Sequence, residues 1–203
     1  MVDVASLVPS TRDFLQAVAT RKKRLVLVPL VDRVDDAVTL AAAGVTAFAV
    51  ASPGALMRAV SDATGAAPIL SLAPVASADE ALLARASGAD AVVVAPVSEA
   101  SRWNSLAKDA VSTRMAALAL VVDGASANFA ATTTARGAYL RTEAATSLLP
   151  LVQKLGSLRT VAQVASADET ALRALRGVVD AAIVESDLYL STSFETLREE
   201  LDP

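Results

Sequence analysis

The chain has 203 residues, of which 54% are hydrophobic, 3% aromatic and 20% charged, and its formal net charge is −4. This length suits one domain, and so apolar a chain can bury a large core, which excludes a disordered protein. Neither Cys nor His is present, so disulfides, Cys/His zinc sites, Cys nucleophiles and Ser-His-Asp triads are excluded. Any general acid or base must be Asp, Glu, Lys or Tyr, and any metal ion would be Mg²⁺ or Ca²⁺ on oxygen ligands.

Charge and hydropathy also bear on partners and location. The negative net charge argues against nucleic-acid binding, which needs a basic face, and the one basic run, residues 21–24, is interpreted as a solvated strand entrance. Residues 1–10 lack the pattern of a secretion signal. No uninterrupted apolar stretch reaches the roughly 18 residues that span a membrane. We therefore expect a cytoplasmic protein with no nucleic-acid or membrane partner.

Eight short runs rich in Val, Leu and Ala predict β-strands, and the segments between them have helical periodicity. Several of these runs are apolar without interruption, which is typical of parallel strands that are covered on both faces. The predicted strands are Arg24–Leu30, Thr46–Ala51, Pro68–Ala73, Asp90–Ala95, Ala116–Val122, Gly137–Arg141, Arg159–Val164 and Asp180–Glu185.

The segments between the strands carry signals for helix ends. Two predicted helices are followed by Gly44 and by Gly88, and glycine is favoured just after a helix because it adopts a left-handed conformation. Residues 77–80 and 166–169 both read Ser-Ala-Asp-Glu, a capping box in which the Ser and Glu side chains bind free backbone amides. Each box comes just after a predicted strand, where a βα turn places a helix start.

Eight strands alternating with helices fit either a closed (β/α)8 barrel or an open doubly wound sheet. An internal repeat favours the barrel. Val-Ala-Ser-Ala-Asp-Glu occurs at 75–80 and again at 164–169, 89 residues later (164 − 75), which is four predicted βα units. Similar half-barrels produce such a repeat, and the alternative is chance similarity in an Ala-rich chain. We predict one (β/α)8-barrel domain over residues 1–203, in which residues 1–23 form an N-terminal extension and short helix.

Several motifs resemble a known family. Pro68-Ile69-Leu70 is followed by LARASGADAVVV at 83–94, Arg12-Asp13-Phe14 precedes the first strand, and residues 179–184 precede a last helix at 194–201. These motifs are similar to those of indole-3-glycerol phosphate synthase, a (β/α)8-barrel lyase of tryptophan biosynthesis. The resemblance spans nearly the whole chain and implies a ribulose-phosphate-binding type of barrel.

The resemblance does not extend to the residues that carry the family's chemistry. Val28 and Leu30 stand where the family pattern has Glu and Lys, and Leu72 stands at a second essential Lys. Leu120 falls near the family's catalytic Glu, and Gln163 replaces a further Glu. Since Val and Leu neither transfer a proton nor hold charge, we predict no catalytic residue among these positions, and no cofactor.

The phosphate site of the family is not expected either. Barrels of this kind hold phosphate on backbone amides in Gly-rich turns after the seventh and eighth strands, whereas this chain has no glycine after Gly177. Glu185 and Asp187 follow the eighth predicted strand. A carboxylate at ~4 Å from a phosphate charge costs roughly 4 kcal/mol at an effective dielectric constant of 20.

Polar side chains nevertheless remain at the predicted carboxyl ends of the strands, namely Asp32, Asp123, Arg141, Glu143, Gln163, Glu185 and Asp187. One interpretation is an ion pair of Arg141 with Glu185 or Glu143 that closes the barrel. A second makes Asp123 and Asp187 helix N-caps. A third makes Asp123, Glu185 and Asp187 a small-ligand or Mg²⁺ site.

We interpret the chain as an indole-3-glycerol phosphate synthase-like barrel without the family's chemistry, a non-catalytic pseudoenzyme acting as scaffold, regulator or subunit partner. The expected partner is another protein or a second copy of the chain, with Trp103 as either a contact residue or a core residue. The alternatives are a lyase with a rebuilt carboxylate site and a binder of a small apolar ligand at the barrel mouth. A polar cleft where Asp123, Gln163 and Glu185 converge would favour an enzyme, and a mouth filled by apolar side chains a scaffold.

Overall fold

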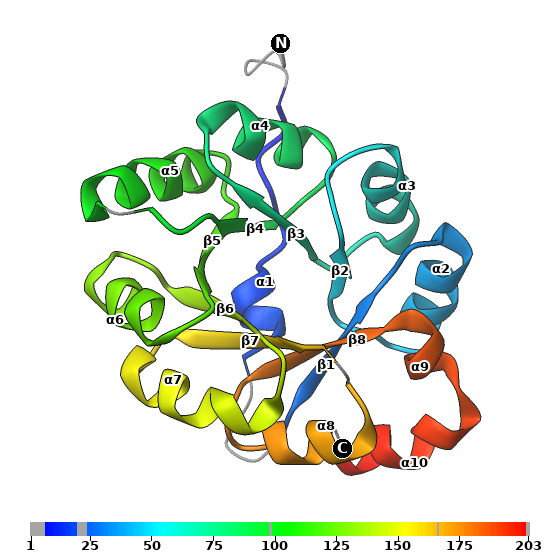
Figure 1. The fold of residues 1–203 in the computed structure, drawn as a ribbon. Helices are drawn as coiled ribbons and strands as arrows, with labels where there is room; N and C mark the ends of the chain where they lie inside the picture. Colours follow the sequence, from blue (N-terminus) through cyan, green and yellow to red (C-terminus); the bar gives the residue numbers. More distant parts are fainter. Residues whose placement is uncertain (1–6, 20–23, 98, 166, 202–203) are drawn as a thin grey trace.

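A computed structural model of the chain describes residues 7–19, 24–97, 99–165 and 167–201, without the side chains of 192 and 193. Its parallel strands close into a barrel in chain order, from β1 round to β8 (Figure 1). This is the (β/α)8 barrel that the sequence predicts, and each strand lies within two residues of its predicted bounds. The strands are β1 (Val26–Leu30), β2 (Phe48–Val50), β3 (Ile69–Val75), β4 (Ala91–Val94), β5 (Ala116–Val121), β6 (Gly137–Thr142), β7 (Arg159–Val164) and β8 (Ala181–Glu185).

Helices alternate with the strands and surround them (Figure 1). No helix in the described part of the chain combines the length and the apolar character needed to cross a membrane. The helices are α1 (Phe14–Ala17), α2 (Val34–Ala42), α3 (Ala55–Thr64), α4 (Ala78–Ala86), α5 (Ala100–Ser112), α6 (Gly124–Thr132), α7 (Leu148–Leu155), α8 (Glu169–Leu175), α9 (Ser186–Leu190) and α10 (Thr192–Leu201), with a 3-10 turn at Ala145–Ser147.

The third strand runs two residues past its predicted end at Ala73. It continues through Pro74 to Val75, and its pairing with β4 shifts register between Ser71 and Val75. Proline has no amide hydrogen for a strand ladder and is therefore tolerated where the pairing is irregular. The sequence-based prediction ended the strand at this proline, and the register shift is what lets the strand go on.

The two copies of the hexapeptide repeat follow β3 and β7, as predicted, but start their helices differently. Ser77 accepts a hydrogen bond from the Glu80 amide (3.3 Å), and the Glu80 carboxylate accepts one from the Ala76 amide (2.6 Å). In the second copy the predicted cap, Ser166, lies outside the described residues. There Asp168 accepts from the Ala171 amide (2.8 Å) and caps α8.

The apolar strands are buried on both faces because the barrel wall separates two layers of core. In β1, Val26 and Val28 belong to the cluster inside the barrel, whereas Leu27 and Val31 belong to the cluster between the wall and the helices. This alternation follows the two-residue period of a strand. It explains why the predicted strands are continuously apolar.

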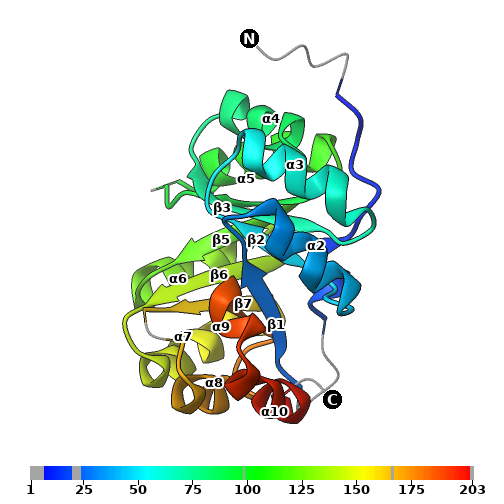
Figure 2. The same ribbon diagram turned by 90° about the vertical axis from the view of Figure 1, so that its right-hand side faces the viewer.

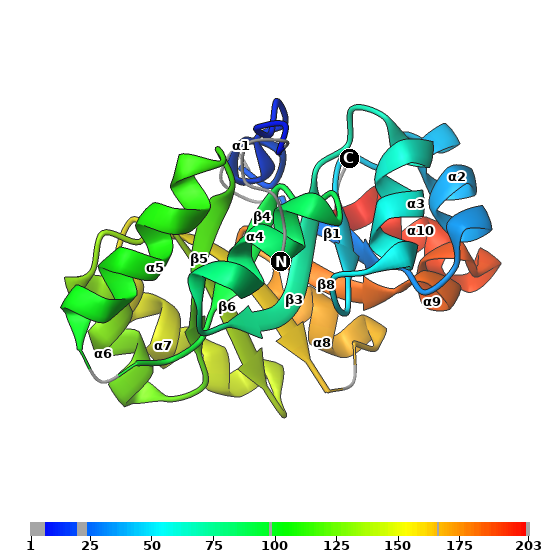
Figure 3. The same ribbon diagram turned by 90° about the horizontal axis from the view of Figure 1, so that it is seen from above.

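The short helix α1 closes the end of the barrel at which the strands begin (Figure 3). Phe14, Leu15 and Val18 are buried and belong to the interior cluster. Gly137, the first residue of β6, makes room for Leu15, because a Cβ atom there would lie 2.9 Å from Leu15 Cδ2. The N-terminal extension therefore supplies part of the interior core.

A buried carboxylate holds the segment before α1 in place. The Asp90 side chain is 0% exposed and forms ion pairs with Arg12 (2.8 Å) and Arg85 (3.0 Å). It also accepts hydrogen bonds from Ser10 Oγ (2.5 Å) and from the Ile69 amide (2.9 Å). Figure 2 shows this segment running beside the α3, α4 and α5 side of the barrel. Asp90 thus joins the N-terminal segment, β3 and β4.

Asp180 occupies the matching place in the second half of the barrel. It accepts hydrogen bonds from the Thr160 amide (2.8 Å) and hydroxyl (3.0 Å) and pairs with Arg159 (3.2 Å). Asp180 thereby links the starts of β7 and β8, as Asp90 links those of β3 and β4. The similarity of the two halves therefore reaches both ends of these strands.

Replacing Asp90 by Ala tests this anchor. The change leaves two guanidinium groups without their buried counter-charge, and we expect the free energy of unfolding to fall by about 3–5 kcal/mol. Asp180→Ala is the matched control, since the Asp180 side chain is 18% exposed, and its cost is about 1–2 kcal/mol. Urea unfolding of both variants measures the difference, and equal costs would contradict the role given to Asp90.

Candidate functional site

The mouth of the barrel lies at the carboxyl ends of the strands, opposite α1, where (β/α)8 barrels bind their ligands. The resemblance singled out Leu30, Leu72 and Leu120, and all three pack against the interior cluster and are partly buried. Val28 lies deeper, at 0% exposure. On β1, β3 and β5 the mouth is therefore filled by aliphatic side chains.

Polar side chains line the other side of the mouth. Arg141, Gln163 and Glu185 lie near the ends of β6, β7 and β8, and Arg141 pairs in register with Gln163. Together with Glu143 they line a cavity of about 710 Å³. The structure thus brings together four of the seven polar residues that the sequence placed at the mouth.

The expected ion pair across the mouth does not form. Within the described ranges, no carboxylate oxygen lies within 4.0 Å of the Arg141 guanidinium, although Glu143 and Glu185 line the same cavity. All three side chains are exposed, so water solvates each charge and a close pair gains little. Arg141 is therefore free to bind an anion.

The other three polar residues lie apart from this cavity. Asp123 is the N-cap of α6, as one interpretation predicts, and its side chain accepts hydrogen bonds from the Ser126 amide and hydroxyl (both 2.7 Å). These bonds lower the pKa of Asp123 because they stabilise its charged form. Asp32 is exposed in the bend after β1.

Asp187 does not serve as the expected N-cap. Glu185 occupies the cap position of α9 and makes no side-chain hydrogen bond there, and Asp187 is exposed in the first turn. The predicted carboxylate site of Asp123, Glu185 and Asp187 is not assembled either. Across the described residues, no group of three acidic side chains is close enough to share a metal ion, because Asp123 lies at α6 and Asp187 at α9.

Tyr139 is a mouth residue that the sequence analysis did not single out as a site. It lies two residues before Arg141 in β6 and so faces the interior, where its hydroxyl donates a hydrogen bond to Gln163 Oε1. Burial raises the pKa of Tyr139 to about 12, although the charge of Arg141 acts in the opposite direction. A phenol with this pKa stays protonated near neutral pH and is a poor general base. The alternation of inward and outward side chains along a strand is the sequence signal that could have identified Tyr139.

The single tryptophan lies in the core. Trp103 belongs to α5, is 1% exposed and packs in the cluster between helices and wall. Of the two roles that the sequence left open, contact with a partner requires an exposed side chain. The structure therefore favours the core role for Trp103.

No protein-family model matches this chain, and no curated protein matches it in sequence. Solved structures do match. A 3-hexulose-6-phosphate synthase is 15% identical, with a TM-score of 0.65, and the match covers 88% of this chain and 97% of that one. A putative phosphonomutase from Burkholderia cenocepacia J2315 is 13% identical (TM-score 0.64; 92% and 94% covered). A putative lyase/mutase from the same organism is 16% identical (TM-score 0.64; 91% and 84% covered).

These similarities place the chain in one structural class, the (β/α)8 barrels, which includes barrels that act on sugar phosphates. At 13–16% identity they concern the fold and not the activity. Fold similarity alone does not define a function, because unrelated reactions occur on the same barrel. Residues at the mouth of a barrel distinguish one function from another.

The buried phenol predicts how stability changes at alkaline pH. The pKa of Tyr139 is about 12 in the folded chain and about 10 in an unfolded one. Its contribution to stability is therefore complete below pH 10 and is lost as the pH rises toward 12. In Tyr139→Phe, urea unfolding across this pH range should show a smaller loss. A tyrosinate absorbance titration that is unchanged by Tyr139→Phe above pH 11 would contradict the high pKa.

Proposed function

We propose that this chain is a non-catalytic (β/α)8 barrel, a pseudoenzyme similar to indole-3-glycerol phosphate synthase that acts as scaffold, regulator or subunit partner. The single observation that carries the proposal is the aliphatic filling of the mouth by Leu30, Leu72 and Leu120. In the family that the motifs resemble, charged side chains occupy or lie near these positions. We also propose that the protein acts in the cytoplasm.

The remaining polar residues support the same proposal. Ring closure with decarboxylation needs a proton donor, a proton acceptor and cations for the carboxylate and phosphate groups. Tyr139 is held protonated by burial, and Asp123 is engaged as a helix cap. Glu185 and Glu143 are exposed carboxylates that line the same cavity, and they repel a phosphate that enters it.

One observation favours a second candidate, an enzyme with a rebuilt site. Arg141, Gln163 and Glu185 line the same cavity of about 710 Å³, and a guanidinium, an amide and a carboxylate together can bind and orient a polar substrate. Asp123, the third residue expected at such a cleft, does not line this cavity. The polar cleft is thus present only on the β6–β8 side.

Charged substitutions at the mouth distinguish a filled mouth from an open one. Leu120→Glu puts a carboxylate against the interior cluster, and we expect the free energy of unfolding to fall by about 2–4 kcal/mol. The matched control is Leu120→Met, which keeps the volume and should cost less than about 1.5 kcal/mol. Urea unfolding measures both. If Leu120→Glu lowers the free energy of unfolding no more than Leu120→Met does, the mouth is hydrated, and this result would favour the enzyme.

A direct assay tests the absence of chemistry. Purified protein is incubated with the substrate of indole-3-glycerol phosphate synthase, and indole-ring formation is followed by fluorescence. We expect no turnover above the buffer background, and no thermal stabilisation by inorganic phosphate that is lost in Arg141→Gln, the cation of the mouth cavity. Turnover that disappears in Glu185→Gln would overturn the proposal and establish the rebuilt site instead.

A further inference from the structure

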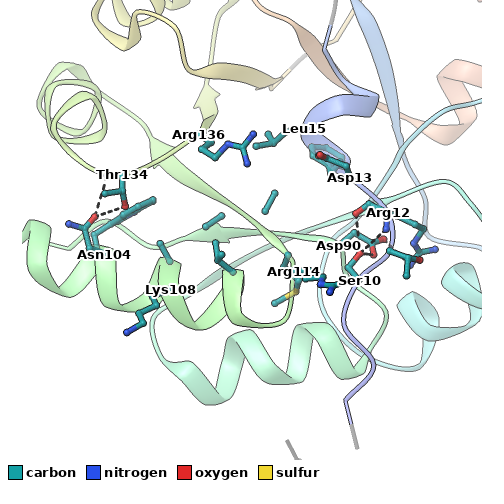
Figure 4. Close-up of a pocket in the computed structure, with 18 residues that line it drawn as sticks. Ser10, Arg12, Asp13, Leu15, Asp90, Asn104, Lys108, Arg114, Thr134 and Arg136 are labelled. Atoms are coloured by element: carbon teal, nitrogen blue, oxygen red, sulfur yellow. Dashed lines mark hydrogen bonds and ion pairs between the residues drawn. The ribbon is translucent and has the colours of Figure 1, made fainter. Parts of the chain in front are cut away.

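A second large cavity lies at the opposite end of the barrel, beside α1. Its volume is about 580 Å³, within the range of small-molecule sites. Residues 10–15 form one wall and α5 the other (Figure 4). Apolar side chains that line it include Leu15, Trp103, Val111 and Met115. None of the predicted or observed mouth residues belongs to this cavity.

The negative charges in the cavity are already engaged. Asp90 is bound by Arg12 and Arg85. The Asp13 carboxylate caps α1 and accepts a hydrogen bond from the Gln16 amide (3.0 Å). Asp90 is therefore neutralised by cations, whereas the partner of Asp13 is an uncharged amide, which leaves one negative charge at the cavity.

Three cations that line the cavity have no such partner. Within the described ranges, Lys108, Arg114 and Arg136 make no side-chain hydrogen bond and no ion pair within 4.0 Å. Figure 4 shows Arg136 extending toward Leu15, Arg114 near Ser10, and Lys108 at the outer side of α5. All three cations are exposed and outnumber the one remaining negative charge, that of Asp13. The cavity therefore combines an apolar lining with a net positive charge, in a chain whose net charge is −4.

The backbone at Arg114 is unusual for this chain. Its φ angle is +60°, and Arg114 is the one residue other than glycine with a positive φ in the described part. After α2, α3, α4, α7 and α8 the left-handed position is held by a glycine, as at Gly44 and Gly156. A side chain in this conformation costs stability. An arginine at this position thus gives up local stability, while its charge lies at the cavity.

We propose that this cavity binds a small amphiphilic anion, an oxyanion head on an apolar body. The head pairs with Arg136, whose guanidinium offers paired hydrogen bonds to a carboxylate, phosphate or sulfate. Arg114 and Lys108 add positive potential around the entrance. The apolar body lies along Val111 and Met115. This inference is independent of whether the mouth is catalytic, since the two sites share no residue.

Titration with decanoate, below its micellar concentration, tests the site. Trp103 is the only tryptophan and lines the cavity, so its fluorescence reports binding. We expect saturable binding that is at least tenfold tighter than that of neutral decanol and that weakens as salt is added. Decyl phosphate in place of decanoate shows which head group is preferred, and tighter binding of either anion than of decanol supports the site.

Variants on α5 and beside β6 locate the bound head. Arg136→Gln should weaken decanoate binding at least tenfold. Arg102→Gln removes the same charge from α5 outside the cavity and should change the affinity less than twofold. Arg114→Gly should raise the unfolding temperature by about 2 °C, because glycine suits a positive φ, and yet weaken binding. If Arg114→Gly gains stability and loses affinity for decanoate, Arg114 serves binding and not the stability of the fold.

Several results would overturn the proposal. These are the absence of binding at millimolar decanoate, equal affinity for decanol, and an Arg136→Gln variant that binds like the unchanged chain. Weakening by Arg141→Gln in place of Arg136→Gln would move the site to the mouth. Sedimentation at the titration concentration provides the last check, since a dimer that Arg136→Glu dissociates would show that a second copy covers the cavity.

Discussion

The structure depends on filling the inside of a closed barrel. Eight strands enclose an interior that is just wide enough for side chains, and those side chains must pack without voids. Here α1 supplies Phe14 and Leu15 at one end, valines and alanines fill the middle, and leucines reach the other end. Because Phe14, Leu15 and Val18 belong to the interior cluster, this part of the chain before β1 is a part of the interior.

The same requirement shapes the mouth. Aliphatic residues continue the interior packing up to Leu30, Leu72 and Leu120, which leaves polar side chains only on the β6–β8 side. Charged groups in this region would have to be desolvated, which costs free energy. This chain has aliphatic groups there, and its mouth is accordingly suited to packing on one side and to polar contacts on the other.

Carboxylates at the strand starts organise the opposite end. Asp90 and Asp180 each accept a hydrogen bond from an amide near the start of the preceding strand, that of Ile69 or Thr160, so the two halves of the barrel share this arrangement. In the first half of the barrel, Arg12 and Ser10 also bind Asp90 and so hold the N-terminal segment against the barrel. That segment forms one wall of the cavity beside α1, and Asp90 lines the same cavity.

Periodicity by itself indicated strands alternating with helices, and the internal repeat then favoured the closed barrel over an open sheet. Apolar runs of strand length, helix stops at Gly44 and Gly88, and the repeat at 75 and 164 indicated eight βα units, because these signals are local. The family resemblance pointed to Leu72 and Leu120, and both pack against the interior cluster. The sequence could not show that Arg141 makes no ion pair among the described residues, that Asp123 and Asp187 lie apart, or that Arg136 and Arg114 share a cavity with α1. Those facts depend on distances between segments far apart in the chain, which only the closed barrel sets.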